Sequence, residues 1–276
     1  MKAVSFLISS CDSFSDCWKP YYHGLHKYWP DCPYNVLIVT NFKDSGDPSV
    51  KAIKVGEDKG WSHNTLQALN QIETPYVLYT HEDFWIQKSV YTQVITDYVA
   101  LMERGKAEYI RLYPCPEPDY DFEFDDRLGT LAEEAPYRCS LQVALWRKSV
   151  FQELIVEGEN AWQFEVQGTV RSRKYGSRFL SAKRFLAPDG NLSHFGIDYV
   201  CTAINKGKWS KAAKAYALRE GLAIDFSNRP NETWWHDFVH ASRFGTYINH
   251  ICTMAVRAVK NPSKIISRLC NNRSNF

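Results

Sequence analysis

The sequence predicts an α/β fold in which a mostly parallel sheet is flanked by helices, followed by a C-terminal helical appendage. Short apolar, β-branched runs alternate with segments whose apolar residues recur at helical spacing, which is the pattern of strand, helix, strand units. One such run, residues 76–79 (YVLY), ends abruptly in the polar triplet His81, Glu82 and Asp83. Because ligands bind at the carboxyl edge of open α/β sheets, this strand end is the place to look for a site.

The first ninety residues contain the clearest elements. Ser62 is the expected cap of a helix that follows a turn at Gly60. We expect strands at residues 3–9, 35–40, 52–55 and 76–79, a polar turn at 10–13, and helices at 17–29 and within 60–72.

The second half is less regular. Six acids alternate with aromatics at residues 117–126, which suits an exposed edge strand or a loop, or else a flap that folds over an acceptor. The basic run at 172–181 is either solvated or meets phosphate. We expect strands at residues 108–113 and 139–146, helices at 91–104, 150–155 and 210–224, and a Gly-rich loop at 188–199.

The composition is that of a folded globular protein: the 276 residues are 45% hydrophobic, 14% aromatic and 23% charged. The eight cysteines show no CxxC pair and no zinc-type spacing, so we expect reduced thiols. The apolar start lacks a cleavage site, and no run reaches the ~18 apolar residues of a membrane-spanning helix. We therefore expect a cytoplasmic protein.

The end of the chain differs in charge from the rest. The formal net charge is +2, yet residues 238–276 hold six Lys or Arg and no acid. We expect a main domain at residues 1–240 and a basic amphipathic helical tail at 241–276. Such a tail either faces an anionic surface, of membrane headgroups or nucleic acid, or is a solvated helix.

Two adjacent carboxylates, Glu82 and Asp83, are the first candidate site. Carboxylates at the rim of a buried core must be solvated or bound to a cation. Their oxygens are the ligands that magnesium and manganese prefer. The alternative is an ordinary strand end that carries solvated acids.

A second candidate is Glu165, which stands beside Trp162 and Phe164. A carboxylate flanked by aromatic side chains has a tunable pKa and can act as a general base. The alternative is an amphipathic helix with both aromatics in the core and Glu165 paired. His194, in the Gly-rich loop, is either a structural histidine or a metal or phosphate contact.

Four short motifs follow one another in a recognisable order. They are Ser10-Cys11-Asp12 after the first strand, KYWPDCPY at residues 27–34, Gly60-Trp61-Ser62, and TPYVL followed by Glu82-Asp83-Phe84. In this order the chain resembles bacterial glycosyltransferases of the GT-A type, which build capsular polysaccharide, lipopolysaccharide and related surface glycans. The resemblance covers roughly residues 1–205 and is strongest in the first ninety.

The resemblance implies a Rossmann-like GT-A domain with a nucleotide-sugar donor over the carboxyl ends of the first strands. Asp12 would lie near the base or ribose, and Glu82-Asp83 would take the place of the family's Asp-x-Asp motif. His81 stands where the first Asp of that motif would be. The implied donor contacts are Ser10, Asp12, Trp61, Ser62, Glu82 and Asp83, and the implied ligands of a magnesium or manganese ion are Asp83, Glu82 and His194.

On the acceptor side, Glu165 becomes the base of an inverting transfer, and Trp162 stacks on the acceptor sugar. The implied acceptor is a glycan or lipid-linked glycan. The basic tail would then contact the inner face of an anionic membrane, and no nucleic acid partner is expected.

Two other classes of protein remain open. A nucleotidyltransferase also uses carboxylates and a divalent ion, but it usually shows a Gly-rich loop with Arg or Lys after the first strand, where this chain reads SSCDSFSD. A non-catalytic carbohydrate-binding protein would need only the abundant Trp and Tyr. The acid pair together with the separate Glu165 is more than binding alone requires.

Overall fold

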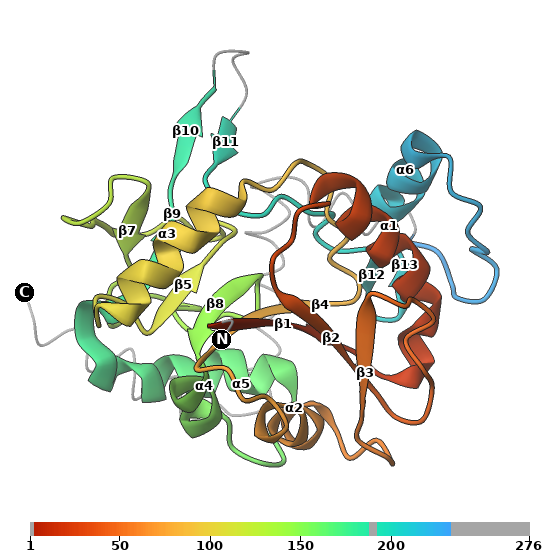
Figure 1. Ribbon diagram of the computed structural model, residues 1–276, viewed down its shortest axis with the longest axis horizontal. Helices are drawn as coiled ribbons and strands as arrows, with labels where there is room; N and C mark the ends of the chain where they lie inside the picture. The colour runs from red at the N-terminus through yellow and green to blue at the C-terminus, as the bar shows by residue number, and fades with distance from the viewer. Residues whose placement is uncertain (1–2, 188–191, 233–276) are drawn as a thin grey trace, which may run out of the picture. The chain divides into compact units, whose positions relative to one another are not determined.

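The computed structural model describes residues 3–187 and 192–232 (Figure 1). Contacts divide the chain into two units, the first consisting of Met1–Ile204 and Ala212–Asp225 and the second of Asn205–Lys211 and the residues from Phe226 onward. The predicted tail at 241–276 lies outside the described residues, so the predicted domain boundary stays a prediction.

The first unit is organised around a nine-stranded sheet with the order β3-β2-β1-β4-β8-β5-β9-β7-β6. Its strands are β1 (Val4–Ser9), β2 (Asn35–Thr40), β3 (Val50–Lys54), β4 (Tyr76–His81), β5 (Tyr109–Arg111), β6 (Tyr120–Asp121), β7 (Leu128–Thr130), β8 (Ala144–Arg147) and β9 (Phe179–Ala182). The strands β3, β2, β1 and β4 pair in parallel, β8 is antiparallel to β4 and β5, and β9 is parallel to β5. Within this sheet β8 and β7 run against the common direction, which confirms the predicted mostly parallel sheet.

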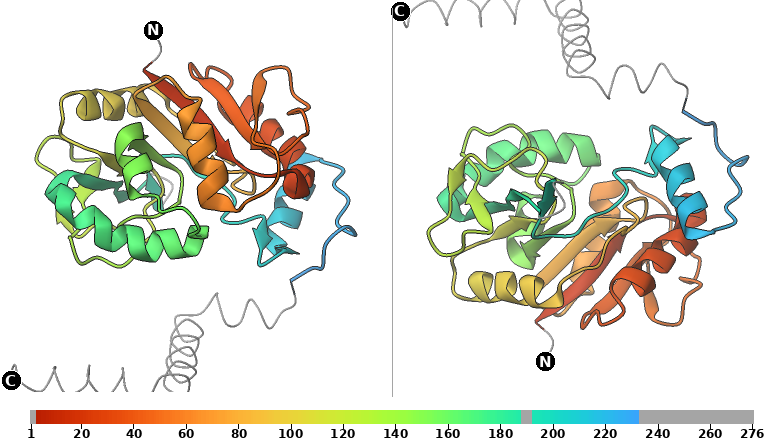
Figure 2. Two further views of the ribbon diagram at one scale, coloured as in Figure 1. Left: turned by 90° about the horizontal axis from the view of Figure 1, so that it is seen from below. Right: turned by 90° about the horizontal axis from the view of Figure 1, so that it is seen from above.

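Helices cover both faces of this sheet (Figures 1 and 2). The helices are α1 (Trp18–Tyr28), α2 (Trp61–Asn70), α3 (Thr92–Glu103), α4 (Lys148–Leu154), α5 (Ala161–Ser172) and α6 (Lys211–Glu220), with 3-10 turns η1 (Asp12–Cys17) and η2 (Arg173–Arg178). Helices α2, α4 and α5 lie on one face, and α1 and α3 lie on the other. Four further short strands lie outside this sheet and form two pairs: β10 (Arg184–Leu186) with β11 (Leu192–His194), and β12 (Ile204–Asn205) with β13 (Lys208–Trp209).

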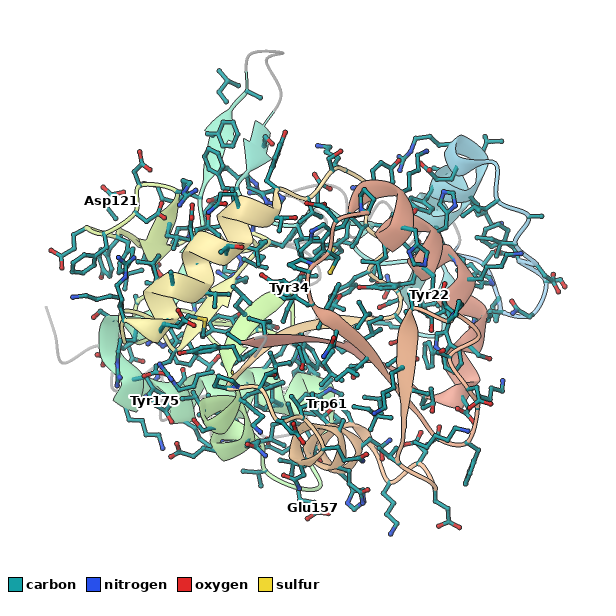
Figure 3. The ribbon with its side chains drawn as sticks, viewed as in Figure 1. Tyr22, Tyr34, Trp61, Asp121, Glu157 and Tyr175 are labelled. Carbon is teal, nitrogen blue, oxygen red and sulfur yellow. The ribbon has the colours of Figure 1, made fainter. Side chains whose placement is uncertain are left out.

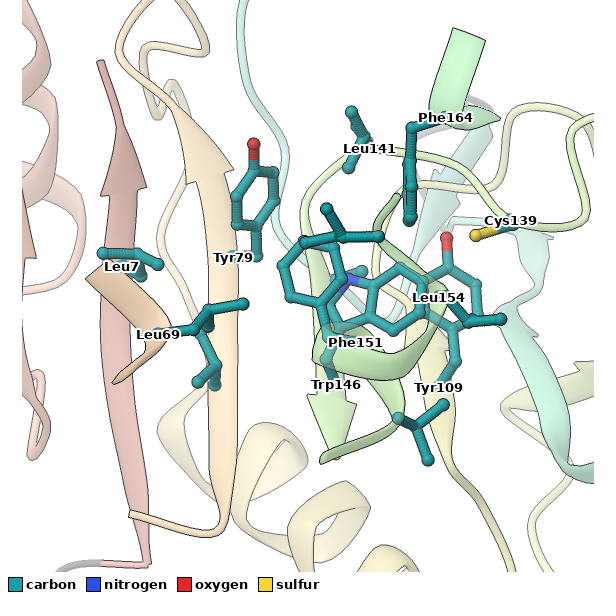
Figure 4. Close-up of a cluster of buried hydrophobic side chains, with 14 of the residues drawn as sticks. Leu7, Leu69, Tyr79, Tyr109, Cys139, Leu141, Trp146, Phe151, Leu154 and Phe164 are labelled. Atoms are coloured by element: carbon teal, nitrogen blue, oxygen red, sulfur yellow. The ribbon is translucent and has the colours of Figure 1, made fainter. Parts of the chain in front are cut away.

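The face under α2, α4 and α5 is filled by large aromatic side chains (Figure 4). Trp146 of β8 stacks on Phe151 of α4 with ring centroids 4.5 Å apart, and Tyr109 of β5 lies 4.2 Å from Trp146. Burying each such ring stabilises the fold by about 1.5–3 kcal/mol. The core therefore joins the middle strands of the sheet to the helices that carry Trp61 and Glu165.

Helix α6 is tied to α1 by one buried carboxylate. Glu220 accepts hydrogen bonds from Lys27 Nζ at 2.6 Å and from the Tyr28 hydroxyl at 2.7 Å, and it pairs with His23 Nε2 at 3.1 Å. Burial alone would raise the pKa of Glu220, but these bonds, together with one from Arg219, outweigh it and lower the pKa to about 2. The carboxylate is thus a charged link between the two helices.

Several sequence-based expectations need correction. Gly60, at φ 94°, is the N-cap of α2, and it makes no side-chain capping bond; the Ser62 hydroxyl instead accepts the Gly158 N–H at 3.0 Å. The strand expected at 139–146 begins only at Ala144. The stretch expected as a loop at 188–199 contains β11.

Other expectations agree with the structure. The acidic stretch at 117–126 contains β6, which is the edge strand of the sheet. The cations of the basic run pair with carboxylates, Arg173 with Glu134, Lys174 with Glu153 and Arg178 with Glu108, which favours a structural role. The six cysteines among the described residues are free thiols. No helix within 3–187 or 192–232 is both long and apolar enough to cross a membrane.

Candidate functional site

The candidate site lies where β1 and β4 end side by side. Ser9 and His81 are register partners, and the Glu82 N–H donates to the Ser9 carbonyl at 3.3 Å. The segments that begin at Ser10 and at Glu82 therefore leave the sheet at the same edge. This is the carboxyl edge, where the sequence predicted the two acids.

Asp12 organises the loop that follows β2. Its carboxylate accepts the backbone N–H groups of Asn41 at 2.9 Å, Phe42 at 3.0 Å and Lys43 at 3.1 Å. In return, the Asn41 side-chain oxygen accepts the Asp12 N–H at 3.0 Å. The structure thus gives Asp12 a role in holding two strand ends together, and its contact with a base or ribose stays a prediction.

Ser10 and Trp61 are both engaged in hydrogen bonds at this edge. The Ser10 hydroxyl accepts from Trp18 Nε1 at 2.7 Å. Trp61 is the first residue of α2 (Figure 3). Its Nε1 donates to the Tyr79 hydroxyl at 2.8 Å, and the centroid of its ring lies 4.9 Å from that of Phe164. Trp61 therefore bridges β4 and α5, whereas Ser62 is buried against Gly158.

His81 is a neutral histidine. Its ring lies 5.2 Å from the ring of Tyr79 and 5.2 Å from that of Phe84, both edge-on. Burial lowers the pKa of His81 to about 4, because the charged imidazolium loses its hydration. At neutral pH this residue therefore brings no charge to the position where the resemblance places the first acid of the Asp-x-Asp motif.

The two acids differ in their surroundings. Glu82 is only 7% exposed. The pKa values of Cys11 and Tyr79 are raised chiefly by the burial of these two residues, and the charge of Glu82 raises both further. The Asp83 carboxylate accepts a hydrogen bond from the Thr202 hydroxyl, and the Asp83 carbonyl accepts the Ala203 N–H at 2.9 Å. Asp83 is thus fixed by a segment that is distant in sequence.

Glu165 sits on the inner side of α5. The helix begins with a capping box in which Asn160 and Gln163 exchange hydrogen bonds at 2.9 Å. Glu165 Oε1 accepts the Leu141 N–H at 2.8 Å and the Ser140 hydroxyl at 3.1 Å. Burial raises the pKa of Glu165, because the charged carboxylate loses its hydration.

The aromatic neighbours of Glu165 divide between two environments. Phe164 is fully buried in the core, whereas Trp162 is 54% exposed. The amphipathic helix was one of the two expectations for this segment, but its placement of Trp162 in the core is wrong. Trp162 and Glu165 are three residues apart on the helix and so lie on neighbouring positions of its surface.

Tyr79 of β4 senses the charges of acids from two elements, Glu82 after β4 and Glu165 of α5. The pKa of Tyr79 is raised first by burial and then by the charges of Glu82 and Glu165. Its hydroxyl, drawn in Figure 4, lies 3.5 Å from His81 Nε2. Tyr79 is the register partner of Ala144, the first residue of β8, so the segment that binds Glu165 through Ser140 and Leu141 leaves the sheet at the same edge as Glu82.

His194 is not brought to these acids. A row of rings, Phe84, Tyr199 and Tyr113, runs between His81 and His194, with successive centroids 4.5 to 5.3 Å apart. Burial lowers the pKa of His194 to about 4. Among residues 3–187 and 192–232, no three His, Cys, Asp or Glu side chains are gathered so that they could hold a metal ion. The predicted set of Glu82, Asp83 and His194 is therefore not assembled.

A smaller metal site fits the residues that are present. Glu82 and Asp83 offer hard carboxylate oxygens, and Mg²⁺ is commonly held by one or two carboxylates together with substrate phosphates. Such an ion would depend on the ligand for the rest of its coordination.

Sequence reasoning missed several residues of this site. Tyr79 had a usable signal, since it precedes His81 by two residues and must share its face of the sheet. No such signal marks Thr202, because its partner Asp83 is 119 positions away. None marks Ser140 or Leu141 either, because their partner Glu165 is 25 and 24 positions away.

Comparisons with known proteins give distant similarities. No protein-family model and no curated protein matches the sequence. Among solved structures, S. aureus TarS 1-349 in complex with UDP is 14% identical, with 66% of this chain and 58% of that chain covered and a TM-score of 0.46. The same protein in complex with UDP-GlcNAc is 12% identical, with 81% and 68% covered and a TM-score of 0.41. The bifunctional IspDF from Campylobacter jejuni is 11% identical, with 70% and 52% covered and a TM-score of 0.39.

Proposed function

We propose that this protein is a glycosyltransferase that moves a sugar from a nucleotide-sugar donor to a glycan or glycolipid acceptor. The observation that carries the proposal is the grouping of two strand-end acids with a separate carboxylate on α5. Glu82 and Asp83 follow β4 directly, and Glu165 binds Ser140 and Leu141 of the segment that enters β8 beside Tyr79. Acids of two kinds at one carboxyl edge fit a reaction that must hold a diphosphate and also deprotonate a hydroxyl.

The donor is assigned to the ends of β1 and β4. Asp83 and Glu82 would hold a divalent ion, magnesium or manganese, which supplies neutralisation of the charge on the departing diphosphate. Asp12 and its partner Asn41 hold the loop that follows β2. In the same loop the Lys43 ammonium donates a hydrogen bond to the Ser15 hydroxyl at 2.7 Å. We assign nucleoside binding to this loop.

The acceptor is assigned to α5. Trp162 offers an exposed ring next to Glu165, and sugars present an apolar face to such rings. The other exposed side chains along this helix up to residue 170 are uncharged, namely Gln163, Val166, Gln167 and Val170. A face of this kind suits the uncharged part of a glycan.

The chemistry follows from this arrangement. Glu165 accepts the proton of the acceptor hydroxyl, whose oxygen forms a bond to the anomeric carbon. The bond from that carbon to the phosphate oxygen breaks, and its electron pair leaves with the nucleoside diphosphate. A single base on the side opposite the leaving group gives inversion at the anomeric carbon.

We place this reaction in the synthesis of bacterial surface polysaccharide, such as capsule or lipopolysaccharide, at the inner face of the membrane. The basic charge of residues 238–276 supports this setting. Binding to vesicles that contain anionic lipid should weaken with salt, and deletion of the residues after 245 should abolish it. Salt-independent binding, or binding that survives the deletion, would contradict a role for the tail.

Isothermal titration with a panel of nucleotides, nucleotide sugars and free sugars, with and without manganese, tests the proposal. UDP and UDP-GlcNAc, the ligands of the TarS complexes, are the first probes. We expect a nucleotide sugar to bind and then to be turned over when a glycan acceptor is added. Binding of nucleoside triphosphates with release of pyrophosphate would favour a nucleotidyltransferase, and binding of sugars alone would favour a carbohydrate-binding protein.

A further inference from the structure

A fully buried arginine binds the segment that also binds Glu165. Arg111, the last residue of β5, is 0% exposed. Its guanidinium donates to the Pro116 carbonyl at 2.6 Å, the Tyr137 carbonyl at 3.1 Å and the Ser181 hydroxyl at 3.3 Å. All three acceptors are neutral, and within the described part of the chain no ion pair joins Arg111 to a carboxylate. A buried charge without a counterion is destabilising, so this residue calls for a functional reason.

The segment that orients Glu165 is held from the other side by Arg111. Arg111 binds the carbonyl of Tyr137, and Glu165 binds Ser140 and Leu141. Between these points the Tyr109 hydroxyl donates to the Ser140 carbonyl at 3.0 Å. Residues 137–141 are therefore fixed between β5 and α5, and the position of the Glu165 carboxylate depends on both ends.

The charge of Arg111 also reaches Glu165. The titratable groups that share this charge environment are Tyr79 of β4, Tyr109 of β5 and Cys139. Burial raises the pKa of each of the three, so all are neutral at physiological pH. Burial also raises the pKa of Glu165; the hydrogen bonds from Leu141 and Ser140 oppose that rise, and the positive charge of Arg111 opposes it further. Arg111 is thus the permanent charge that favours the ionised form of Glu165.

We propose that Arg111 is a positioning residue for Glu165: its sealed guanidinium both anchors the segment 137–141 and supplies the positive charge that keeps the carboxylate ready to accept a proton. Its role in catalysis rests on the proposed glycosyltransferase function. The electrostatic part stands alone and can be measured without any substrate.

Arg138 provides a matched control. It is also 0% exposed, and its guanidinium likewise donates to neutral oxygens only, the carbonyls of Leu131 and Gly176 and the Ser172 hydroxyl. Its charge is not among those that act on Glu165. The two arginines thus share burial and bonding, but only Arg111 is coupled to the candidate base.

The test is an NMR titration of the Glu165 side-chain carboxyl carbon in the full chain, assigned with Glu165→Gln. We expect its pKa to rise by about one unit in Arg111→Met and to stay near the wild-type value in Arg111→Lys, which keeps the charge. Arg138→Met disturbs the same segment but removes no charge that acts on Glu165, so it should raise the pKa by less than Arg111→Met does. An unchanged Glu165 pKa in folded Arg111→Met, or an equal rise in Arg138→Met, would overturn the proposal.

A reciprocal measurement covers the case in which the neutral arginine variants do not fold. In Glu165→Gln, which keeps the helix and its hydrogen-bond acceptors, the Nε resonance of Arg111 should shift and that of Arg138 should not. If both resonances shift equally, or if neither shifts, the proposal would also be overturned. If no nucleotide sugar is turned over by the wild type, the proposed function fails while both NMR results keep their meaning.

Discussion

The two halves of the sheet are built in different ways. The strands β3, β2, β1 and β4 are five or six residues long and pair in parallel, and their ends carry Asp12, Glu82 and Asp83. The strands from β8 to β6 are two to four residues long and of mixed direction. In that half, hydrogen bonds from buried charged side chains help to connect strands and loops, whereas long backbone ladders connect the strands of the first half.

Glu108 illustrates this second mode. It is 6% exposed and accepts hydrogen bonds from Arg147 and, at 2.7 Å, from Arg178. Together with Arg111 and Arg138 it links strands to loops through side chains. The difference teaches that backbone ladders position Glu82 and Asp83 in the first half, whereas the position of Glu165 in the second half depends on individual polar contacts.

The largest expected effect concerns Glu165 in the half with short strands. Glu165→Gln removes the proposed base but keeps an acceptor for Leu141 and Ser140, so the rate of transfer should fall by about 10²- to 10⁴-fold. Glu153→Gln, which alters an exposed acid on the neighbouring helix α4, should keep the wild-type rate. Steady-state kinetics with the identified donor measures both; wild-type turnover in Glu165→Gln would remove it as the base.

The next effect separates the two aromatics of α5. Phe164→Ala opens a cavity between Trp61 and Phe151 and should lower the free energy of unfolding by about 3–5 kcal/mol. Trp162→Ala, at an exposed position, should change it by less than about 0.5 kcal/mol. Urea unfolding checks the pair, and equal losses would show that Trp162 is part of the core after all.

A smaller effect is expected in the first half. Asp12→Ala leaves the three N–H groups of residues 41–43 without their acceptor, and it should cost about 1–3 kcal/mol of stability. Asp44→Ala in the same loop removes an exposed pair with Lys54 and is the control. Equal, small changes in chemical denaturation would mean that Asp12 is not a structural clamp.

The smallest effect is a pH dependence at α6. The pKa of Glu220 in the folded protein is about 2, below the ordinary value of 4.5, so its contribution to stability is present above that ordinary value and is lost as the pH falls toward 2. The difference in urea midpoint between wild type and Glu220→Gln should therefore shrink from pH 7 to pH 3. A difference that is the same at both pH values would contradict the charged link.

The contrast between the halves also explains what the sequence could predict. The strand at residues 35–40 was predicted with the bounds that β2 shows, because a continuous apolar run between polar turns specifies a buried parallel strand. The acids after β4 were found for the same reason, since the end of such an apolar run can be recognised from the sequence alone.

In the other half the decisive contacts are not local. Residues 139–143 look like a strand because Leu141 and Val143 are apolar, yet their backbone is directed by Glu165 and Thr169 of α5. Arg111 stands in a predicted strand, where a cation gives no sign that it will be buried. Such residues can be identified only once the fold has brought their partners together.

We propose that the end of β4 binds the donor and that Glu165 of α5 accepts the proton of the acceptor. Calorimetric titration of the identified nucleotide sugar into Asp83→Ala and Glu165→Gln tests it most directly. We predict wild-type affinity in Glu165→Gln and affinity weaker by about tenfold to a hundredfold in Asp83→Ala, which loses a charged contact to the donor side. Unchanged affinity in Asp83→Ala, or an equal loss in both variants, would contradict the account.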